Sequence, residues 1–290
     1  MTFLIVSVVL NSLLSVIFRY FKEWNINNFA AIVVNYVVCF IIGIIMSGGE
    51  VLRLGDIDSS WVPYLITLGT IFIVTFNVIA ATVQIFGITI ATLTQKMSVL
   101  LVVIFSIGYY QEQLNLYRSL GLLAGFISIF LITGKPAKRK VSPTSRYLIL
   151  LPIIVFFLGG VIDSIFVHIS RLEITNGAED QFAAFLFGFA GFLGLFYLLF
   201  KMIVQKQRYT WRDVGAGILL GVPNFFTVYF IQKMLTTDMD GSVIFPIHNI
   251  GILLLSALIS RMLFGEEFRI LKYVGIVLAT IAIILLAIGS

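Results

Sequence analysis

Long apolar runs alternate with short polar stretches along the whole chain. Ten such runs can be drawn, at 3–21, 29–47, 62–84, 87–110, 116–133, 148–170, 182–204, 214–235, 242–264 and 271–289. A helix needs about 20 mostly apolar residues to cross a bilayer core. Lipid offers no partners to backbone N–H and C=O groups, so an open chain spans it as helices. The pattern therefore predicts an all-α polytopic membrane protein with ten transmembrane helices. Trp24, Trp61 and Trp211 fall at run edges, where an aromatic belt is expected.

The composition indicates a lipid environment and excludes several kinds of functional site. Hydrophobic residues make up 60% of the chain and charged residues 11%, against about 45–50% and about 25% in soluble domains. The single cysteine, Cys39, excludes a disulfide framework and is expected to be a buried thiol. Two histidines are too few for a histidine metal centre. We therefore expect no metal, no cofactor and no nucleic-acid partner, since the net charge of +5 is spread over short loops.

The two halves of the chain resemble each other. A basic linker loop, 134–147, separates a first half, 1–133, from a second, 148–290. Residues that coincide at a spacing of 154 positions are Gln95 with Asn249, Glu112 with Glu266, Arg118 with Lys272, and Gly121 with Gly275, while Asn77 falls on Asn224 at a spacing of 147. Five spans per copy is an odd number, so the second copy must be inverted. Inverted five-helix repeats are typical of secondary transporters, with the substrate site between the halves.

A short motif identifies a family resemblance. Glu112 precedes Gly121, and Gly265-Glu266 precedes Gly275, at the start of the last helix of each half. This arrangement resembles the EamA-type members of the drug/metabolite transporter superfamily, although Gln111 stands where the first copy usually has Gly. The resemblance covers the whole chain. It implies a ten-helix duplicated fold and alternating-access transport of a small organic solute, without indicating which solute.

Two charges lie inside predicted spans. A charge at the bilayer centre costs roughly 2.5–3.5 kcal/mol on insertion scales, so each should face a polar cavity or a partner. Lys96 is suited to bind an anionic group or to pair with a carboxylate, although a lysine can also reach an interface with its long stem. Asp163 is suited to bind a cationic group, to carry a proton, to pair with Lys96, or to form a hydrogen bond that joins two helices. We leave these alternatives open.

Polar uncharged residues complete the candidate solute pathway. Asn11 is the repeat mate of Asp163, Gln95 is beside Lys96, and His248 and Asn249 follow Pro246. Such residues line cavities or hydrogen-bond neighbouring helices. The full set of candidate pathway residues is Asn11, Asn77, Gln95, Lys96, Asp163, His168, Asn224, His248 and Asn249. Glu112 and Glu266 are expected instead to be structural carboxylates near helix starts, where the helix dipole favours negative charge.

The predicted function is secondary transport of a small organic solute, with the proton as a candidate coupling ion and a monomer or homodimer as the functional unit. The alternative is a membrane-embedded enzyme or lipid-translocating protein acting on lipid-linked substrates. Asp163, His168 and Arg171 form the cluster available to such an enzyme. We place the chain in a cell membrane, the inner membrane of a bacterium. Fourteen of the 19 Lys and Arg residues lie in or beside alternate loops, which puts both termini outside by the positive-inside rule. The family resemblance implies both termini inside.

Overall fold

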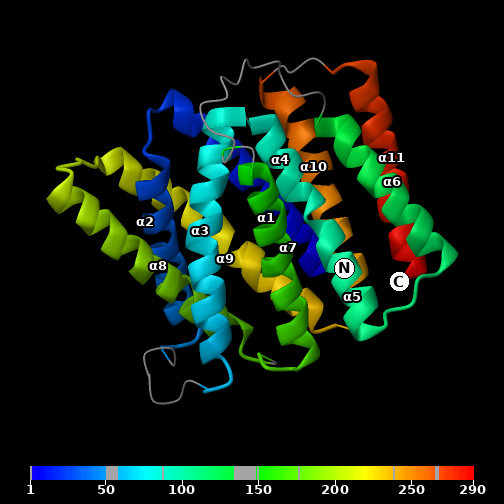
Figure 1. Cartoon of the computed structure of the whole chain (residues 1–290), viewed down its shortest axis with the longest axis horizontal. Coiled ribbons are helices and arrows are strands. Elements are labelled where there is room, and N and C mark those ends of the chain that lie inside the picture. Colours follow the sequence, from blue (N-terminus) through cyan, green and yellow to red (C-terminus); the bar gives the residue numbers. More distant parts are fainter. Residues whose placement is uncertain are drawn as a thin grey trace. The chain divides into compact units, whose positions relative to one another are not determined.

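A computed structural model describes residues 2–49, 58–86, 88–133, 148, 150–175, 177–237, 239–264 and 268–290. Throughout these ranges the regular structure is helical (Figure 1). The helices are α1 (Thr2–Glu23), α2 (Asn28–Met46), α3 (Val62–Phe86), α4 (Ile88–Met97), α5 (Val99–Tyr110), α6 (Leu116–Thr133), α7 (Leu150–Arg171), α8 (Glu179–Val204), α9 (Trp211–Leu235), α10 (Gly241–Phe264) and α11 (Ile270–Gly289).

Within the described ranges, nine helical stretches are long and apolar enough to cross a membrane, and the apolar part of α1, Thr2–Phe18, is a shorter tenth. The prediction of an all-α, multi-pass chain is confirmed at this level. One predicted run differs from the structure. The run at 87–110 is two helices, α4 and α5, which together make the candidate span Ile90–Tyr110.

The chain divides into two compact units that do not follow the two sequence halves. Unit 1 comprises Met1–Ile73 and Ile169–Thr236, and unit 2 comprises Val74–His168 and Thr237–Ser290. Each unit thus draws helices from both halves of the chain. The boundaries 1–133 and 148–290 remain a prediction about sequence repeats, whereas the units describe which helices pack together.

Unit 1 is built around α2, which packs against α8 and α9, while α1 packs against α9. Small residues allow the close approach. A Cβ on Gly217 would lie 2.5 Å from the carbonyl oxygen of Ala31, and one on Gly221 would lie 2.4 Å from Val38 Cγ1. No side chain fits at either position. The glycines at 217 and 221 therefore serve helix packing.

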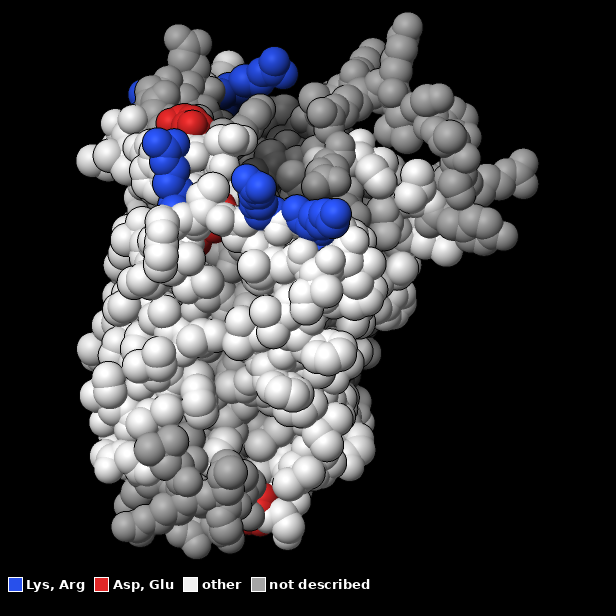
Figure 2. Space-filling view, turned by 90° about the vertical axis from the view of Figure 1, so that its left-hand side faces the viewer, with Lys and Arg blue, Asp and Glu red and all other residues white. Residues whose placement is uncertain are grey.

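The outer surface of unit 1 suits a lipid environment. Figure 2 views the side on which α2 and α8 lie, and its visible charged side chains are near the two ends of that face, with a broad uncharged band between them. On α8, Phe192, Phe196 and Ile203 are 66%, 71% and 77% exposed. Exposed aromatic and aliphatic side chains at this density are costly in water and favourable in lipid.

The three tryptophans do not behave alike. Trp24 and Trp211 are exposed, as an aromatic belt requires, but only 6% of Trp61 is exposed. The indole N–H of Trp61 donates to the carbonyl of Ile174 at 2.8 Å, and its ring contacts Phe182 edge-on. Trp61 is therefore part of the packing of unit 1 rather than of its surface, because its indole N–H has a hydrogen-bond acceptor in the interior.

Unit 2 contains an antiparallel pair, α6 and α11, which lie side by side at the right of Figure 1. A Cβ on Gly121 would lie 2.9 Å from Leu286 Cγ, and one on Gly275 would lie 2.9 Å from Ile132 Cγ1. Helix α10 packs against α5, α6 and α11. It meets α6 at Gly125, where a Cβ would lie 2.5 Å from Ile250 Cδ1. Glycines 121 and 125 therefore allow α6 to pack closely against α11 and α10.

Candidate functional site

The site begins at the junction between α4 and α5 in unit 2. Ser98 separates the two helices, and its hydroxyl donates to the carbonyl of Gln95 at 2.6 Å. The N–H of Leu101 bonds to the Ser98 carbonyl at 2.9 Å, only three residues back, which is a tighter turn than an α-helix makes. Lys96 lies in the last turn of α4, where a positive charge is favoured by the helix dipole.

Lys96 is bound to α10 through Asn249. The Lys96 ammonium donates to Asn249 Oδ1 at 3.1 Å, and the Asn249 amide Nδ2 donates to the carbonyl of Phe245 at 3.2 Å. The second bond turns the amide so that its oxygen, rather than its NH₂ group, faces the cation. Asn249 is 7% exposed, and the bond is a partly buried contact between two helices.

Helix α7 brings Asp163 to the same place because two glycines let it approach the α4–α5 junction. A Cβ on Gly159 would lie 2.8 Å from Ser98 Oγ, and one on Gly160 would lie 2.5 Å from Leu101 Cδ1. Asp163 is one helical turn beyond Gly159 and on the same face. The Asp163 carboxylate and the Lys96 ammonium interact electrostatically. Within the described part of the chain, no ion pair with N···O within 4.0 Å joins them.

His248 is the fourth member of this cluster. Its imidazole is 8% exposed on α10, two residues after Pro246, and it is within electrostatic range of Lys96. Two opposite charges, an oriented amide and an imidazole therefore meet inside three apolar stretches of unit 2. Such groups can hold polar parts of a solute. Among the described residues, no group of three or more His, Cys, Asp or Glu side chains is arranged to hold a metal ion.

The other predicted pathway residues are distributed over both units. Gln95 is exposed on α4, and Asn77 is exposed on the part of α3 that belongs to unit 2. Asn11 is half-buried on α1 in unit 1. The structure thus brings together Lys96, Asp163, His248 and Asn249 from the predicted set. A shared cavity for all nine residues stays a prediction.

His168 takes a partner of its own. Its Nδ1 lies 2.7 Å from the hydroxyl of Tyr110 at the end of α5, and the Tyr109 ring contacts its imidazole edge-on. Asp163, five residues earlier, instead interacts with Lys96. The two side chains therefore have different partners among the described residues.

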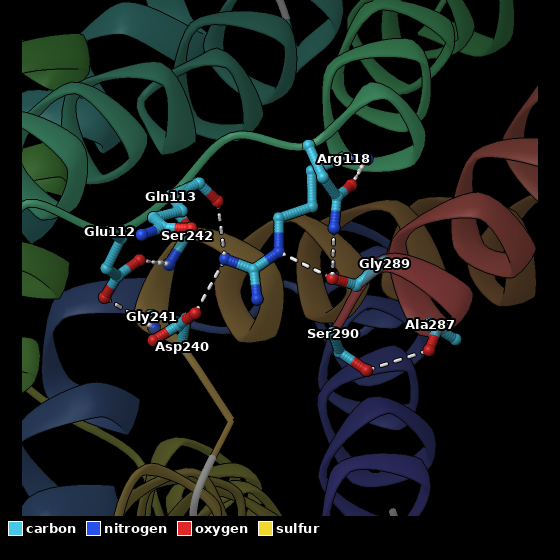
Figure 3. A network of polar contacts seen from close by, with 10 residues as sticks. Glu112, Gln113, Arg118, Asp240, Gly241, Ser242, Ala287, Gly289 and Ser290 are labelled. Carbon is cyan, nitrogen blue, oxygen red and sulfur yellow. Dashed lines mark hydrogen bonds and ion pairs between the residues drawn. The ribbon is translucent and has the colours of Figure 1, made fainter.

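Glu112 stabilises the start of a helix that is distant in the sequence. Its carboxylate accepts the N–H of Gly241 at 3.3 Å and of Ser242 at 3.0 Å, the first residues of α10 (Figure 3). The expected partner was α6. The carboxylate reaches α10 instead because the segment after α5 runs past the α10 N-terminus, where free N–H groups attract an anion. Glu266 lies outside the described residues.

Arg118 joins the same network, which sequence reasoning missed. Its guanidinium is held at 2.7 Å by Asp240 Oδ2, 2.8 Å by the carbonyl of Gly289 and 2.9 Å by the carbonyl of Gln113 (Figure 3). It thereby links α6 to the start of α10 and the end of α11. The sequence pointed to Arg118 only through its match with Lys272, which indicates a cation at the same place in both halves. That match does not indicate which residues Arg118 contacts.

A second polar contact lies in unit 1, and the sequence analysis identified only one of the two asparagines that form it. Asn224 on α9 donates to Asn35 Oδ1 on α2 at 3.3 Å, and the Cys39 thiol lies 3.3 Å from the carbonyl of Gly221. Cys39 is fully buried, as expected. Asn35 was missed, although it is a lone amide in an apolar run four residues before Cys39. These contacts join helices, which is a common use of Asn within membranes.

Comparison with known proteins gives the fold but no function. No family model matches the chain. An uncharacterized protein of Haemophilus influenzae (strain ATCC 51907 / DSM 11121 / KW20 / Rd) is 25% identical over 222 residues, which is 76% of this chain and 74% of that protein. One protein of known crystal structure superposes with a TM-score of 0.77 over 99% of this chain and 96% of its own, at 14% identity. The chain therefore shares that protein's fold over nearly its whole length.

Proposed function

We propose that this chain is a secondary active transporter that moves a small organic solute across a cell membrane by alternating access, as an EamA-like member of the drug/metabolite transporter superfamily. The observation that carries the proposal is the cluster of Lys96, Asp163, His248 and Asn249 within apolar spans of unit 2. Lys96 lies in the candidate span Ile90–Tyr110 and Asp163 in Leu150–Arg171. Ionisable groups at such positions are costly, and they commonly line substrate or ion pathways.

The position of the cluster also favours a transporter. It lies at the tightened turn between α4 and α5, and irregular turns of spanning helices form substrate and ion sites in many transporters. The hydrogen bond from Lys96 to Asn249 joins α4 to α10. These segments are repeat mates in the sequence alignment at 154 positions. A binding site between repeat mates is the place that alternating access requires.

The direction of two helix pairs supports an inverted repeat. Repeat mates α6 and α11 run antiparallel, since Gly121 meets Leu286 and Gly275 meets Ile132. Mates α2 and α8 also run antiparallel, because Gly43 meets Ala184 at one end and Gly194 meets Val33 at the other. Copies with the same orientation would place each pair of mates parallel. Each observation lies within a single unit.

No observation favours the membrane-embedded enzyme or the lipid-translocating protein. The enzyme required Asp163, His168 and Arg171 to act together. Asp163 interacts with Lys96, and His168 binds Tyr110.

A thermal-stabilisation screen of the purified protein against fractionated metabolite pools tests the proposal. A ligand at about 100 times its Kd stabilises the folded state by about 2.7 kcal/mol, so a true substrate raises the unfolding temperature measurably. The same fraction is expected to have a much smaller effect on Lys96→Met and its full effect on Lys206→Met, a control at an exposed loop position. If no fraction stabilises the wild-type protein, or if Lys96→Met responds like the control, the proposal fails.

A further inference from the structure

The turn between α8 and α9 carries several positive charges. It joins two candidate membrane spans, Glu179–Val204 and Trp211–Leu235, so in a bilayer it lies at the level of the lipid headgroups. The cations of this stretch are Lys201, Lys206, Arg208 and Arg212. No ion pair within 4.0 Å joins any of them to a described residue. The turn therefore has charge available for an anionic partner.

The acidic side chains near the turn do not neutralise it. Asp213 is 3% exposed, and its carboxylate accepts the N–H groups of Asn27 and Thr210, each at 2.7 Å. That carboxylate is therefore occupied in the interior, where it also caps α9. The bond to Asn27 brings the α1–α2 turn beside the start of α9, and the exposed Glu23 of that turn offsets one cation. A net positive charge remains on the surface.

Aromatic rings hold the Lys201 ammonium at the membrane side of the turn. It lies 4.9 Å from the centroid of the Tyr197 ring and 5.9 Å from that of the Phe29 ring. Long side chains on a helix point back towards its N-terminus, which for α8 is the direction of the apolar span. Aromatic faces attract a cation without neutralising its charge. The ammonium therefore still favours an anion beside it.

The surface that leads to the turn is apolar. Residues Phe192, Phe196, Phe200 and Ile203 of α8 recur at spacings of four, four and three, so they share one face, and all four are exposed. Trp211, at the start of α9, is 88% exposed, and an amphipathic indole favours the boundary between headgroups and acyl chains. The exposed face of α8 thus suits an acyl chain, and the turn at its end suits a negatively charged headgroup.

We propose that this turn binds an anionic phospholipid, with its phosphate on Lys201, Arg208 and Arg212 and an acyl chain along the exposed face of α8. A guanidinium binds phosphate oxygens through two parallel hydrogen bonds. A zwitterionic headgroup also has a phosphate, but it brings a cation that the turn repels. The site belongs to unit 1, whereas the cluster around Lys96 belongs to unit 2. The inference does not rest on the proposed transport function.

The turn between α10 and α11 is less suited to such a lipid. It also has three cations, Arg261, Arg269 and Lys272, but Glu266 and Glu267 lie between them in the sequence. Two negative charges within the same stretch remove most of its net charge. We therefore assign the anionic lipid to the α8–α9 turn and use the α10–α11 turn as a control.

Quenching of Trp211 fluorescence by brominated lipids tests the inference. The full-length protein is reconstituted into vesicles of phosphatidylcholine and phosphatidylglycerol with identical chains, and one lipid or the other carries bromine near the headgroup end of its chains. The difference between the wild type and Trp211→Phe gives the signal of Trp211. Each cation near an anionic surface contributes about fivefold in affinity. We expect Trp211 to prefer phosphatidylglycerol by at least about tenfold, and equal quenching by both lipids would overturn the inference.

Matched variants locate the binding. In the double variant Arg208→Gln/Arg212→Gln the preference should fall by at least about tenfold, whereas lysine at both positions should retain most of it. Arg269→Gln removes one exposed cation from the other turn and should leave the preference unchanged. Each readout is a ratio within one folded protein, so a general loss of stability does not imitate it. A double variant with the wild-type preference, or an Arg269→Gln variant without it, would overturn the assignment.

Two further conditions separate a lipid from a soluble phosphate. Glycerol phosphate at millimolar concentration has the same phosphate chemistry without acyl chains, and it should not displace brominated phosphatidylglycerol. Displacement would show a site for a free phosphate and overturn the assignment to a lipid. Salt at about 0.5 M should lower the preference, because it shortens the range of electrostatic attraction. A preference that does not change with salt would overturn the electrostatic basis of the site.

Discussion

Replacing Gly160 by alanine tests the packing that brings Asp163 to Lys96. The added Cβ would lie 2.5 Å from Leu101 Cδ1, 2.6 Å from Leu101 Cβ and 3.0 Å from Leu101 Cγ. The end of the Leu101 side chain could rotate away, but the Cβ atom of Leu101 is fixed to the backbone of α5. Helix α7 must therefore shift, and overpacking of this kind costs about 1–3 kcal/mol. The shift also moves Asp163, one turn away, relative to Lys96.

A matched control removes the effect of the amino-acid change itself. Gly108 lies in α5, and a Cβ built there meets nothing within 4 Å. Both substitutions gain the same helix propensity, about 1 kcal/mol, so their difference reports the clash. We expect Gly160→Ala to be less stable than Gly108→Ala by about 1–3 kcal/mol in a reversible denaturant titration in detergent, with weaker stabilisation by ligand. Equal stability and equal ligand response of the two variants would refute the reasoning.

Three further predictions concern the α10 start and the coupling of transport. Glu112→Ala leaves two N–H groups of α10 without their acceptor, and each unsatisfied group lowers stability by about 1–3 kcal/mol. Amide hydrogen exchange at residues 241–242 should therefore be at least about tenfold faster than in the control variant Gln113→Ala. Equal exchange rates in the two variants would contradict this. The lysine in Arg118→Lys cannot reproduce the planar guanidinium that binds three acceptors. The variant should therefore have an unfolding free energy lower by about 1–3 kcal/mol. A denaturation midpoint equal to that of the wild type would show that the Arg118 contacts do not stabilise the fold. Asp163→Asn should abolish stimulation of solute flux by a pH gradient, and wild-type flux that ignores the gradient would exclude Asp163 as the proton carrier.

The helical fold could be predicted from the sequence because lipid allows few alternatives. Runs of about 20 apolar residues have to be helices, and every predicted run corresponds to a helix or to the α4–α5 pair. The break at Ser98 could not be predicted, since serine occurs within helices and the sequence there contains no Pro or Gly. In the structure, Ser98 lies against Gly159 of α7, where a Cβ would lie 2.8 Å from Ser98 Oγ.

The charged residues of the cluster could be predicted, because a charge in an apolar span is energetically costly. The residues that they contact could not be predicted. Lys96 and Asp163 stood out because charges are rare in apolar runs. Their distance depends on how closely α7 approaches α5, which two glycines decide and which no spacing along the chain encodes. The Glu179–Lys233 ion pair at 2.7 Å shows the same limit. Both residues lie near run ends, where charges are ordinary, and only the fold of unit 1 brings them together.

Solute flux into proteoliposomes tests the central claim most directly. The solute is one that stabilises the purified protein, and the liposomes contain the wild type, Lys96→Met, Lys206→Met or no protein. We expect saturable flux with the wild type and with Lys206→Met, and flux close to that of empty liposomes with Lys96→Met. Flux with Lys96→Met that matches the wild type, or no flux above empty liposomes with the wild type, would contradict a transporter whose solute binds at Lys96.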